Sequence, residues 1–293
     1  MDKLLALDIG AGTQDIFLFQ SDQPIENCVK LVLPSPTVLV SKKIRHATEL
    51  GKDIWLSGTI MGGGPCVGAI KDHIKQGYRV YSSPKAALTI DDNLCAVESL
   101  GVVITPEAPE FDLFSIELKD LDMMTLRRAL SLYLVELPTY VAVAVQDHGH
   151  CPSGSNRRFR FLHWEKFMLG GGRLEHLCYR DIPDHLTRMK AVQETYEGAI
   201  LMDTGAAAIW GSLTDRRVAQ HRASGFIAVN VGNQHTLGIF LQEDRIWGLF
   251  EHHTRILSRE RILSLIERLA LGNLTNEEVF QDGGHGAYLH PDY

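Results

Sequence analysis

Short apolar runs, separated by glycine-rich or polar turns, open the chain. They lie at residues 3–8, 15–19 and 28–33, and this pattern predicts a three-stranded meander. Residues 122–135 have apolar side chains at helical spacing, which predicts a helix. Residues 140–145 form a nearly continuous apolar and β-branched run, as is typical of a strand buried in a parallel sheet. The beginning of the chain is therefore expected to be an α/β fold.

The rest of the chain repeats part of this order. After a polar, arginine-rich and helical stretch up to about residue 196, a buried strand is predicted at 199–202 and a small-residue helix at 205–213. The order becomes β-β-β-α-β-α-β-α if residues 37–118 are an insertion. The last part is predicted to contain three strands, at residues 226–231, 236–241 and 245–250, followed by an amphipathic helix at 258–271. A fourth short strand at 278–281 and a glycine loop at 283–286 complete it.

One strand-turn-strand phrase occurs twice. Residues 4–22, LLALDIGAGTQDIFLFQSD, align without a gap with residues 226–244, FIAVNVGNQHTLGIFLQED. A shorter repeat relates QDHGH at 146–150 to QDGGH at 281–285. The two repeats follow each other in the same order in both halves of the chain, which indicates two copies of a fold unit. An active cleft between the copies follows as an expectation.

The repeat predicts two domains with an insertion in the first. We place the first domain at residues 1–214, its insertion at about 37–118, and the second domain at 215–293. The helix, strand and helix that would complete a second copy are missing from the sequence. A naturally short chain, a truncated product and a partner chain that supplies the rest all remain open. An incomplete second half would expose apolar surface, so homo-oligomer formation is also expected as a possibility.

Composition narrows the class of protein. The 293 residues have a formal net charge of −7 and a pI near 6.0, which argues against nucleic acid as the default partner. No apolar stretch is long enough to predict a membrane span, and the N-terminus lacks the layout of a signal peptide. The five cysteines are widely scattered without a CxxC pair, as is typical of reduced cytosolic thiols. The sequence predicts a soluble, cytoplasmic protein.

The first repeated turn has the residues of an anion-binding loop. Asp8 ends a predicted buried strand, and Gly10 and Gly12 allow a tight turn whose backbone N–H groups can approach an anion. Thr13 adds a hydroxyl donor. The carboxylate of Asp8 can hold Mg²⁺ through water. The alternative is an ordinary β-hairpin with a glycine-rich turn; the matching turn at 232–236 favours the nucleotide interpretation.

Four phrases in order carry a family resemblance: DIGAGTQDIFLF, DTGAAAIWGSL, AVNVGNQHTLGIFL and FQDGGHGA. They resemble the motif plan of the actin, Hsp70 and sugar-kinase superfamily, the actin-like ATPases. The resemblance implies two ribonuclease-H-like halves around a cleft that binds ATP and Mg²⁺. It implies Mg²⁺ at Asp8 and cofactor contacts from two phosphate loops and an adenosine loop, namely Asp8, Gly10, Gly12, Thr13, Gln14, Asn230, Gly232, Asn233, Gln234, Thr236, Gly283 and Gly284.

Two aspartates are candidates for the catalytic groups. By the superfamily plan, Asp203 would orient the attacking water or hydroxyl, although Asp before TGAAA is equally a good helix N-cap. Asp147 follows a predicted buried strand and would act as a general base for a substrate hydroxyl. The chain departs from the plan at Asn230, where the superfamily usually has Asp. The second connecting helix is also missing.

A closer resemblance is to one family within that superfamily, whose label names a pyruvate formate-lyase activating enzyme. The phrases MGGGP, VAVAVQDHGH and GGHGA are similar to its hallmarks. A radical activating enzyme requires a three-cysteine iron–sulfur motif, and this sequence has none. That activity is therefore not expected.

Other clusters have both a chemical and a structural interpretation. His148 or His150 can ligate a metal, with His285 and His290 approaching the same place, or the DHGH segment is a hydrogen-bonded polar turn. The glycine run before the predicted helix 66–76 can bind a substrate anion, or it packs closely on a neighbouring strand. The arginines Arg157, Arg158 and Arg160 can clamp a phosphate or lie in solvent. The neighbours His252 and His253 lack metal-site spacing.

The leading interpretation is an ATP- and Mg²⁺-binding protein that acts as a phosphotransferase or ATPase on a small metabolite. The alternative is a nucleotide-dependent regulator or assembly protein that acts through a protein partner. A repeat-derived scaffold without nucleotide is a third interpretation. A rate stimulated by a small substrate favours the first, and slow hydrolysis altered only by a protein favours the second.

Overall fold

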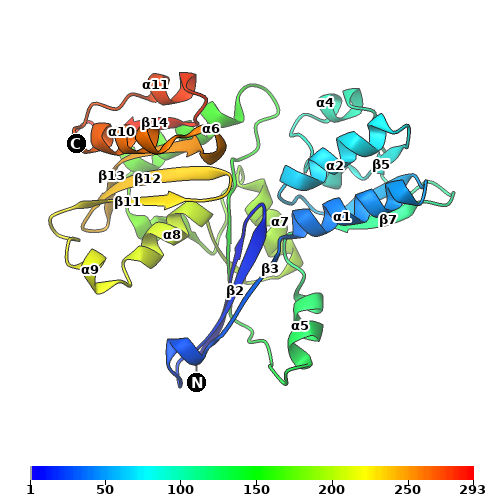
Figure 1. Ribbon diagram of the computed structural model, residues 1–293, viewed down its shortest axis with the longest axis horizontal. Coiled ribbons are helices and arrows are strands. Elements are labelled where there is room, and N and C mark those ends of the chain that lie inside the picture. The colour runs from blue at the N-terminus through cyan, green and yellow to red at the C-terminus, as the bar shows by residue number, and fades with distance from the viewer. Residues whose placement is uncertain (1) are drawn as a thin grey trace. The chain divides into compact units, whose positions relative to one another are not determined.

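The computed structural model describes residues 2–293 (Figure 1). These residues form two compact units. The first unit contains the residues up to Ser153 together with Arg180–Leu201. The second contains Gly154–Tyr179 and Met202–Tyr293. The protein is an α/β protein with both parallel and antiparallel sheets.

The predicted meander begins the first unit and is joined by parallel strands. Strand β8 pairs in parallel with β1, with Leu7 opposite Val143, which confirms the predicted buried parallel strand. Alternate residues of β8 are buried, because each successive side chain points to the opposite face of the sheet. Within this unit the strand order is β3-β2-β1-β8-β10. The elements are β1 (Lys3–Ile9), β2 (Thr13–Gln20), η1 (Ile25–Asn27), β3 (Val29–Pro34), α5 (Met123–Ser131), β8 (Val141–Val145), α7 (Thr187–Thr195) and β10 (Ile200–Met202).

A second sheet of the first unit lies in the segment that we expected to be an insertion. Its four strands are all parallel, in the order β6-β5-β4-β7. They share one apolar core with the surrounding helices, in which Ile44, Leu56 and Ile70 are fully buried. The elements are α1 (Pro36–Glu49), β4 (Ile54–Gly58), α2 (Gly64–Lys75), β5 (Val80–Ser82), α3 (Pro84–Ala87), α4 (Leu94–Ser99), β6 (Val102–Ile104) and β7 (Phe114–Leu118).

The second unit is built on an antiparallel sheet with helices on both faces. Its strand order is β11-β12-β13-β14, and α8 and α10 lie on opposite faces (Figure 1). Leu237 and Ile239 of β12 pack with α6 and α8, whereas Phe250 of β13 packs with α10 and α11. The elements are α6 (Asn156–Leu169), η2 (Leu174–Leu177), β9 (Cys178–Tyr179), α8 (Thr204–Ser212), α9 (Arg216–Ala219), β11 (Phe226–Val231), β12 (His235–Gln242), β13 (Arg245–His253), η3 (Thr254–Ile256), α10 (Arg259–Ala270), α11 (Asn276–Gln281) and β14 (Gly286–Leu289).

The two repeated phrases form hairpins with the same register. Ile9 pairs with Gln14 in the first hairpin, and the aligned residues Val231 and Thr236 pair in the second. The similarity ends beyond the hairpins. In the first unit β1 continues into the parallel pair with β8, whereas β14 adds to the second sheet antiparallel to β13, at the side away from β11.

Two expectations from the sequence need correction. The segment 278–281, predicted as a strand, is the end of helix α11, and the strand β14 follows the glycine loop instead of preceding it. The Thr275 hydroxyl caps this helix by accepting the backbone N–H of Glu278, which the sequence pattern TNEE permits. Residues 154–179, which we assigned to the first domain, cluster with the second unit because α6 packs on the second sheet.

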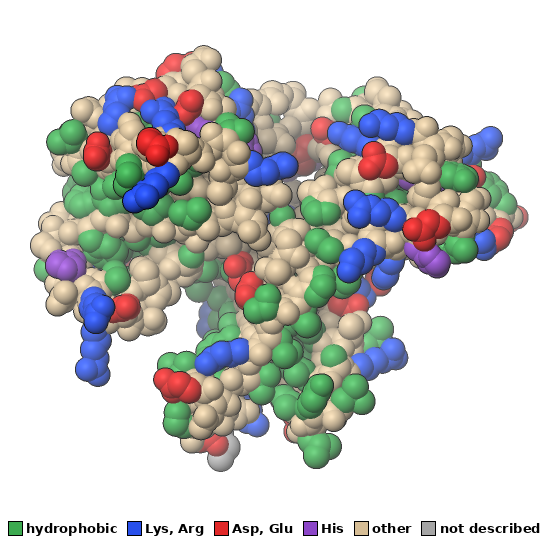
Figure 2. Space-filling view, in the orientation of Figure 1, with side chains coloured by type: hydrophobic (Ala, Val, Ile, Leu, Met, Phe, Trp, Pro, Cys, Tyr) green, Lys and Arg blue, Asp and Glu red, His purple; other side chains and the backbone are tan. Residues whose placement is uncertain are grey.

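Exposed apolar side chains gather on and after α5 in the first unit, where Figure 2 shows green atoms over this helix. Leu134 is 93% exposed, and Leu132 and Tyr133 are nearly as open. Such a patch is typical of a contact surface. Among residues 2–293, no helix is long and apolar enough to cross a membrane.

Candidate functional site

The first hairpin turn is closed by a backbone hydrogen bond and tied to the start of α1. The Gly10 N–H donates to the Thr13 carbonyl at 3.0 Å, and Asp8 pairs with Asp15 across the two strands. The Ser35 N–H donates to the Gly12 carbonyl at 3.1 Å. The turn is therefore a fixed structure, held from both strands and from the helix that follows.

One predicted cofactor residue of this turn already has a structural role. The buried Gln14 amide donates to the Pro34 carbonyl at 3.0 Å, joining β2 to β3. The Thr13 hydroxyl lies 3.4 Å from a carboxylate oxygen of Asp15. Gln14 thus joins two strands of the sheet. Asp8, Gly10, Gly12, Thr13 and Gln14 all stay predictions as nucleotide contacts.

The MGGGP segment lies beside this turn. A Cβ built on Gly64 would be 3.8 Å from the Ala11 Cβ, so the two glycine-rich loops are neighbours. Gly64 has a φ of +38°, a conformation that glycine adopts easily, and it begins α2. The Thr37 hydroxyl donates to the Gly63 carbonyl at 2.5 Å and accepts the Cys66 N–H at 3.1 Å. Both interpretations of the glycine run, close packing and an anion-binding helix start, are compatible with this geometry.

Arg188 and Asp120 meet at the same loops, and the sequence analysis did not identify either of them. The Arg188 guanidinium donates to both Asp120 carboxylate oxygens, at 2.7 and 3.0 Å, and to the Gln146 carbonyl at 2.8 Å. Asp120 also accepts the Gly62 N–H at 3.2 Å. This ion pair ties the MGGGP loop, the segment after β7 and the QDHGH segment to α7. No sequence signal joins these residues, because they are far apart along the chain.

Asp147 anchors the QDHGH segment. Its buried carboxylate accepts the N–H of Gly149 and the N–H of Met189, both at 2.9 Å. The carboxylate thereby fixes its own loop to the first turn of α7. The structure thus adds a structural role that the sequence did not predict, and general-base catalysis by Asp147 stays a prediction.

Replacement of Asp147 by alanine is expected to lower the free energy of unfolding of the first unit by about 2 kcal/mol, because two buried N–H donors lose their acceptor. Asp181→Ala, which removes an exposed carboxylate of the same unit, is the matched control and should stay within about 0.5 kcal/mol of wild type. Urea denaturation measures both variants. An Asp147→Ala protein as stable as wild type would leave catalysis as the better explanation.

The second hairpin turn is closed by the same kind of backbone hydrogen bond as the first, and side chains of the second unit also hold it. The Gly232 N–H donates to the His235 carbonyl at 2.9 Å. The buried Thr236 hydroxyl lies 3.0 Å from the Thr254 hydroxyl, which donates to the Gly232 carbonyl at 2.7 Å. The hydroxyl of Thr236 therefore has a hydrogen-bond partner within the second unit. The aligned position of Thr13 is occupied here by His235.

Asp203 is both a helix cap and a member of a buried ion-pair cluster. Its carboxylate accepts the Gly205 N–H at 3.0 Å, which confirms the predicted N-cap of α8. The other oxygen lies 3.1 Å from Nη1 of Arg160. Arg160 also donates from Nε and Nη2 to the Glu251 carboxylate, at 2.5 and 3.1 Å. We call Arg160, Asp203 and Glu251 the buried triad.

The position of Arg160 contradicts both predictions for the arginine stretch, a phosphate clamp and a solvent-exposed side chain. Only 5% of it is exposed, so it neither lies in solvent nor faces it to clamp a phosphate. Burial alone would lower the pKa of Arg160, but the two carboxylates raise it above its ordinary range. The helical spacing of Arg160 with Phe161, Trp164 and Met168, all buried, is the sequence signal that could have identified it as inward-facing.

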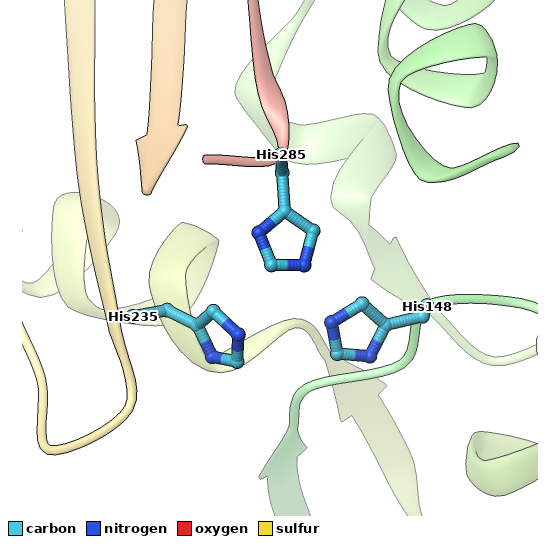
Figure 3. A group of neighbouring side chains, drawn as sticks. All are labelled: His148, His235 and His285. Atoms are coloured by element: carbon cyan, nitrogen blue, oxygen red, sulfur yellow. The ribbon is translucent and has the colours of Figure 1, made fainter. Parts of the chain in front are cut away.

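Three histidines of the second unit adjoin one another. The ring centroids of His235 and His285 are 4.8 Å apart, and His253 lies 5.0 and 4.7 Å from them. Figure 3 shows the rings of His235 and His285 turned toward each other; His148, also drawn, is a residue of the first unit. Burial lowers the pKa of His235 to about 4 and that of His285 to about 2, and it also lowers that of His253. Burial therefore favours the neutral form of all three rings.

The predicted adenosine loop is closely packed. A Cβ on Gly284 would lie 2.5 Å from a ring carbon of His252, and Gly283 has a φ of +87°. The Arg157 guanidinium donates to the Gly284 carbonyl at 2.6 Å. Packing against His252 thus gives a structural reason for Gly284, whatever the loop binds.

The structure divides the predicted site residues between the units. The first unit contains the first phosphate loop and the QDHGH segment, with Asp8, Gly10, Gly12, Thr13, Gln14 and Asp147. The second unit contains the buried triad, whose Glu251 pairs with Leu237 just after the second hairpin turn and accepts the N–H of His285 at the end of the glycine loop. Its predicted residues are Asp203, Asn230, Gly232, Asn233, Gln234, Thr236, Gly283 and Gly284. Nε2 of His290 accepts a hydrogen bond from the Arg245 guanidinium at 2.9 Å, and His290 does not join the three histidines.

No curated protein matches this sequence. A family model does match, over residues 61–292, and its description reads "Putative pyruvate format-lyase activating enzyme (DUF1786)". The matched range includes the MGGGP, QDHGH and GGHGA segments, whereas the first hairpin precedes it. Because the match extends over well more than half of the chain, the protein belongs to this family.

Proposed function

We propose that the protein binds ATP with Mg²⁺ and uses it in phosphoryl transfer, as a phosphotransferase or ATPase that acts on a small metabolite. The observation that supports this proposal is the repeated hairpin. Both copies have the same strand register and the same turn-closing hydrogen bond, from Gly10 to Thr13 and from Gly232 to His235. Such a pair of glycine turns is what the resemblance to the actin-like ATPases implies. The two hairpins would then belong to two ribonuclease-H-like halves.

The first unit would provide the main contact with the phosphates. Its turn is held rigidly by Ser35 and lies beside Gly64, where α2 begins. Backbone N–H groups and the positive end of a helix dipole both favour an anion there. Asp8 would hold Mg²⁺ through water molecules, and Mg²⁺ would neutralise charge on the transferred phosphoryl group.

The position of Asp203 sets the expected rate. A carboxylate that caps α8 and pairs with Arg160 is not free to take a proton from the nucleophile, so it would orient the nucleophile only through neighbouring groups. Asn230 replaces the second carboxylate of the superfamily plan. Turnover would therefore be slow, and a nucleotide-dependent regulator that acts through a protein partner is the second candidate. Stimulation by a small metabolite would favour the enzyme, and stimulation only by a protein would favour the regulator.

Calorimetric titration with ATP and ADP, with and without Mg²⁺, tests the proposal. We expect saturable, Mg²⁺-dependent binding, and Asp8→Ala should weaken it at least about tenfold because the ion loses its carboxylate. Asp22→Ala is the matched control: it removes an exposed carboxylate just beyond the other end of the same hairpin and should not change the affinity. A folded wild-type protein that binds neither nucleotide would contradict the proposal and favour the scaffold interpretation.

A further inference from the structure

Two histidines of the second unit have the geometry of a metal-binding pair. His235 begins β12, and His285 immediately precedes β14. Ligand nitrogens of the two rings lie within 4.8 Å of each other, and their centroids are 4.8 Å apart (Figure 3). Two nitrogens that share one Zn²⁺, each about 2.0–2.1 Å from the ion, are at most about 4 Å apart, so a small rotation of the rings suffices.

Backbone hydrogen bonds hold the main chain of both histidines on one sheet. His235 pairs with His253 across β12 and β13, and the His285 N–H donates to the Glu251 carbonyl at 2.9 Å. Because both histidines attach to the same sheet, the pair is held by ladder hydrogen bonds. Imidazole nitrogens are the commonest protein ligands of such metal ions. The ring of His253 adjoins both.

Charged groups of both signs belong to the surroundings of the pair. The buried triad contains two carboxylates, Asp203 and Glu251, which both contact the Arg160 guanidinium. Arg157 donates to the Gly284 and Phe280 carbonyls and lies over the Phe280 ring. The two carboxylates would attract a divalent cation at the histidines, and the two guanidiniums would oppose it, so the case for the site rests on the placement of the imidazoles.

We propose that His235 and His285 bind one divalent transition-metal ion, of the class that prefers imidazole, such as Zn²⁺ or Co²⁺. The ring of His253 borders the ion, and water completes the coordination. This site is separate from the Mg²⁺ at Asp8, because Mg²⁺ prefers oxygen ligands. The inference does not depend on nucleotide binding.

Metal titration of the full chain, prepared without a histidine tag and without nucleotide, tests the site. The probes are Zn²⁺ by calorimetry and Co²⁺ by its visible absorption, which reports nitrogen coordination. We expect one ion per chain. Even the loss of a group that supports a metal ligand typically weakens affinity about 10–100-fold, so His235→Gln and His285→Gln should each weaken it at least about tenfold.

Two controls separate the site from general histidine binding and from misfolding. His176→Gln removes an exposed histidine of the same unit and should leave the affinity unchanged. Thermal unfolding in the presence of a chelator should show that both site variants are folded. The inference is wrong if folded wild-type protein binds neither ion at one equivalent. It is equally wrong if folded His235→Gln and His285→Gln proteins bind Zn²⁺ as tightly as the His176→Gln control.

Discussion

Replacement of Arg160 by methionine should lower the free energy of unfolding of the second unit by roughly 3–5 kcal/mol. Arg160 is 5% exposed and pairs with both Asp203 and Glu251. Its removal takes away the guanidinium that both buried carboxylates contact. One of these carboxylates, that of Asp203, also caps α8. Chemical denaturation, followed by circular dichroism, measures the loss.

A matched control lies two residues away. Arg158 is an exposed residue of the same helix, and its ion pair with Glu277 is 3.5 Å long and open to water. Arg158→Met should therefore change stability by less than about 1 kcal/mol. Equal effects of the two substitutions would show that the buried triad contributes no more to the free energy of unfolding than the exposed ion pair of Arg158. Partial recovery in Arg160→Met combined with Glu251→Gln would locate the cost in the two carboxylates.

Replacement of Gly238 by alanine is expected to cost about 3 kcal/mol, near the upper end of what overpacking a core produces. Gly238 pairs with Phe250 across β12 and β13, and the Phe250 ring lies over it. A Cβ on Gly238 would be 2.3 Å from a ring carbon of Phe250, which is fully buried and cannot move outward without disturbing the core with α10. Differential scanning calorimetry would show the loss as a lower Tm.

Gly211 provides the opposite case. It lies in α8 of the same unit, and a Cβ there would meet nothing within 4 Å. Gly211→Ala should raise stability by about 0.5–1 kcal/mol, since alanine loses less backbone freedom in a helix. If Gly238→Ala were as harmless as Gly211→Ala, the packing of Phe250 would differ from this structure. Combining Gly238→Ala with Phe250→Leu should cost less than the sum of the two changes.

The local elements were predictable wherever the hydrophobic pattern was long and regular. The two hairpins and strand β8 were located from alternation and continuous apolar runs alone, and the repeat even predicted which residues are equivalent. Helix α11 was missed because its short apolar pattern also fits a strand. The T-x-x-E spacing of Thr275 and Glu278, a signature of a helix start, was the better signal there.

The candidate sites were only partly predictable. The glycine turns were visible because a tight turn requires particular residues at neighbouring positions. The Arg188–Asp120 pair was not visible, because each residue lies in an ordinary segment and their meeting depends on how the loops fold. The same holds for Arg160 with Glu251, which come from a helix and a strand far apart in sequence.

The sequence by itself determined the α/β class, the repeated hairpin and the absence of a three-cysteine motif. These features are local, and they depend on side-chain period, turn chemistry and the spacing of residue types. Only the tertiary structure decided that Asp203, the predicted helix cap, also pairs with Arg160, and that His235 adjoins His285. Burial and charge pairing act between segments that are distant along the chain, so no local pattern records them.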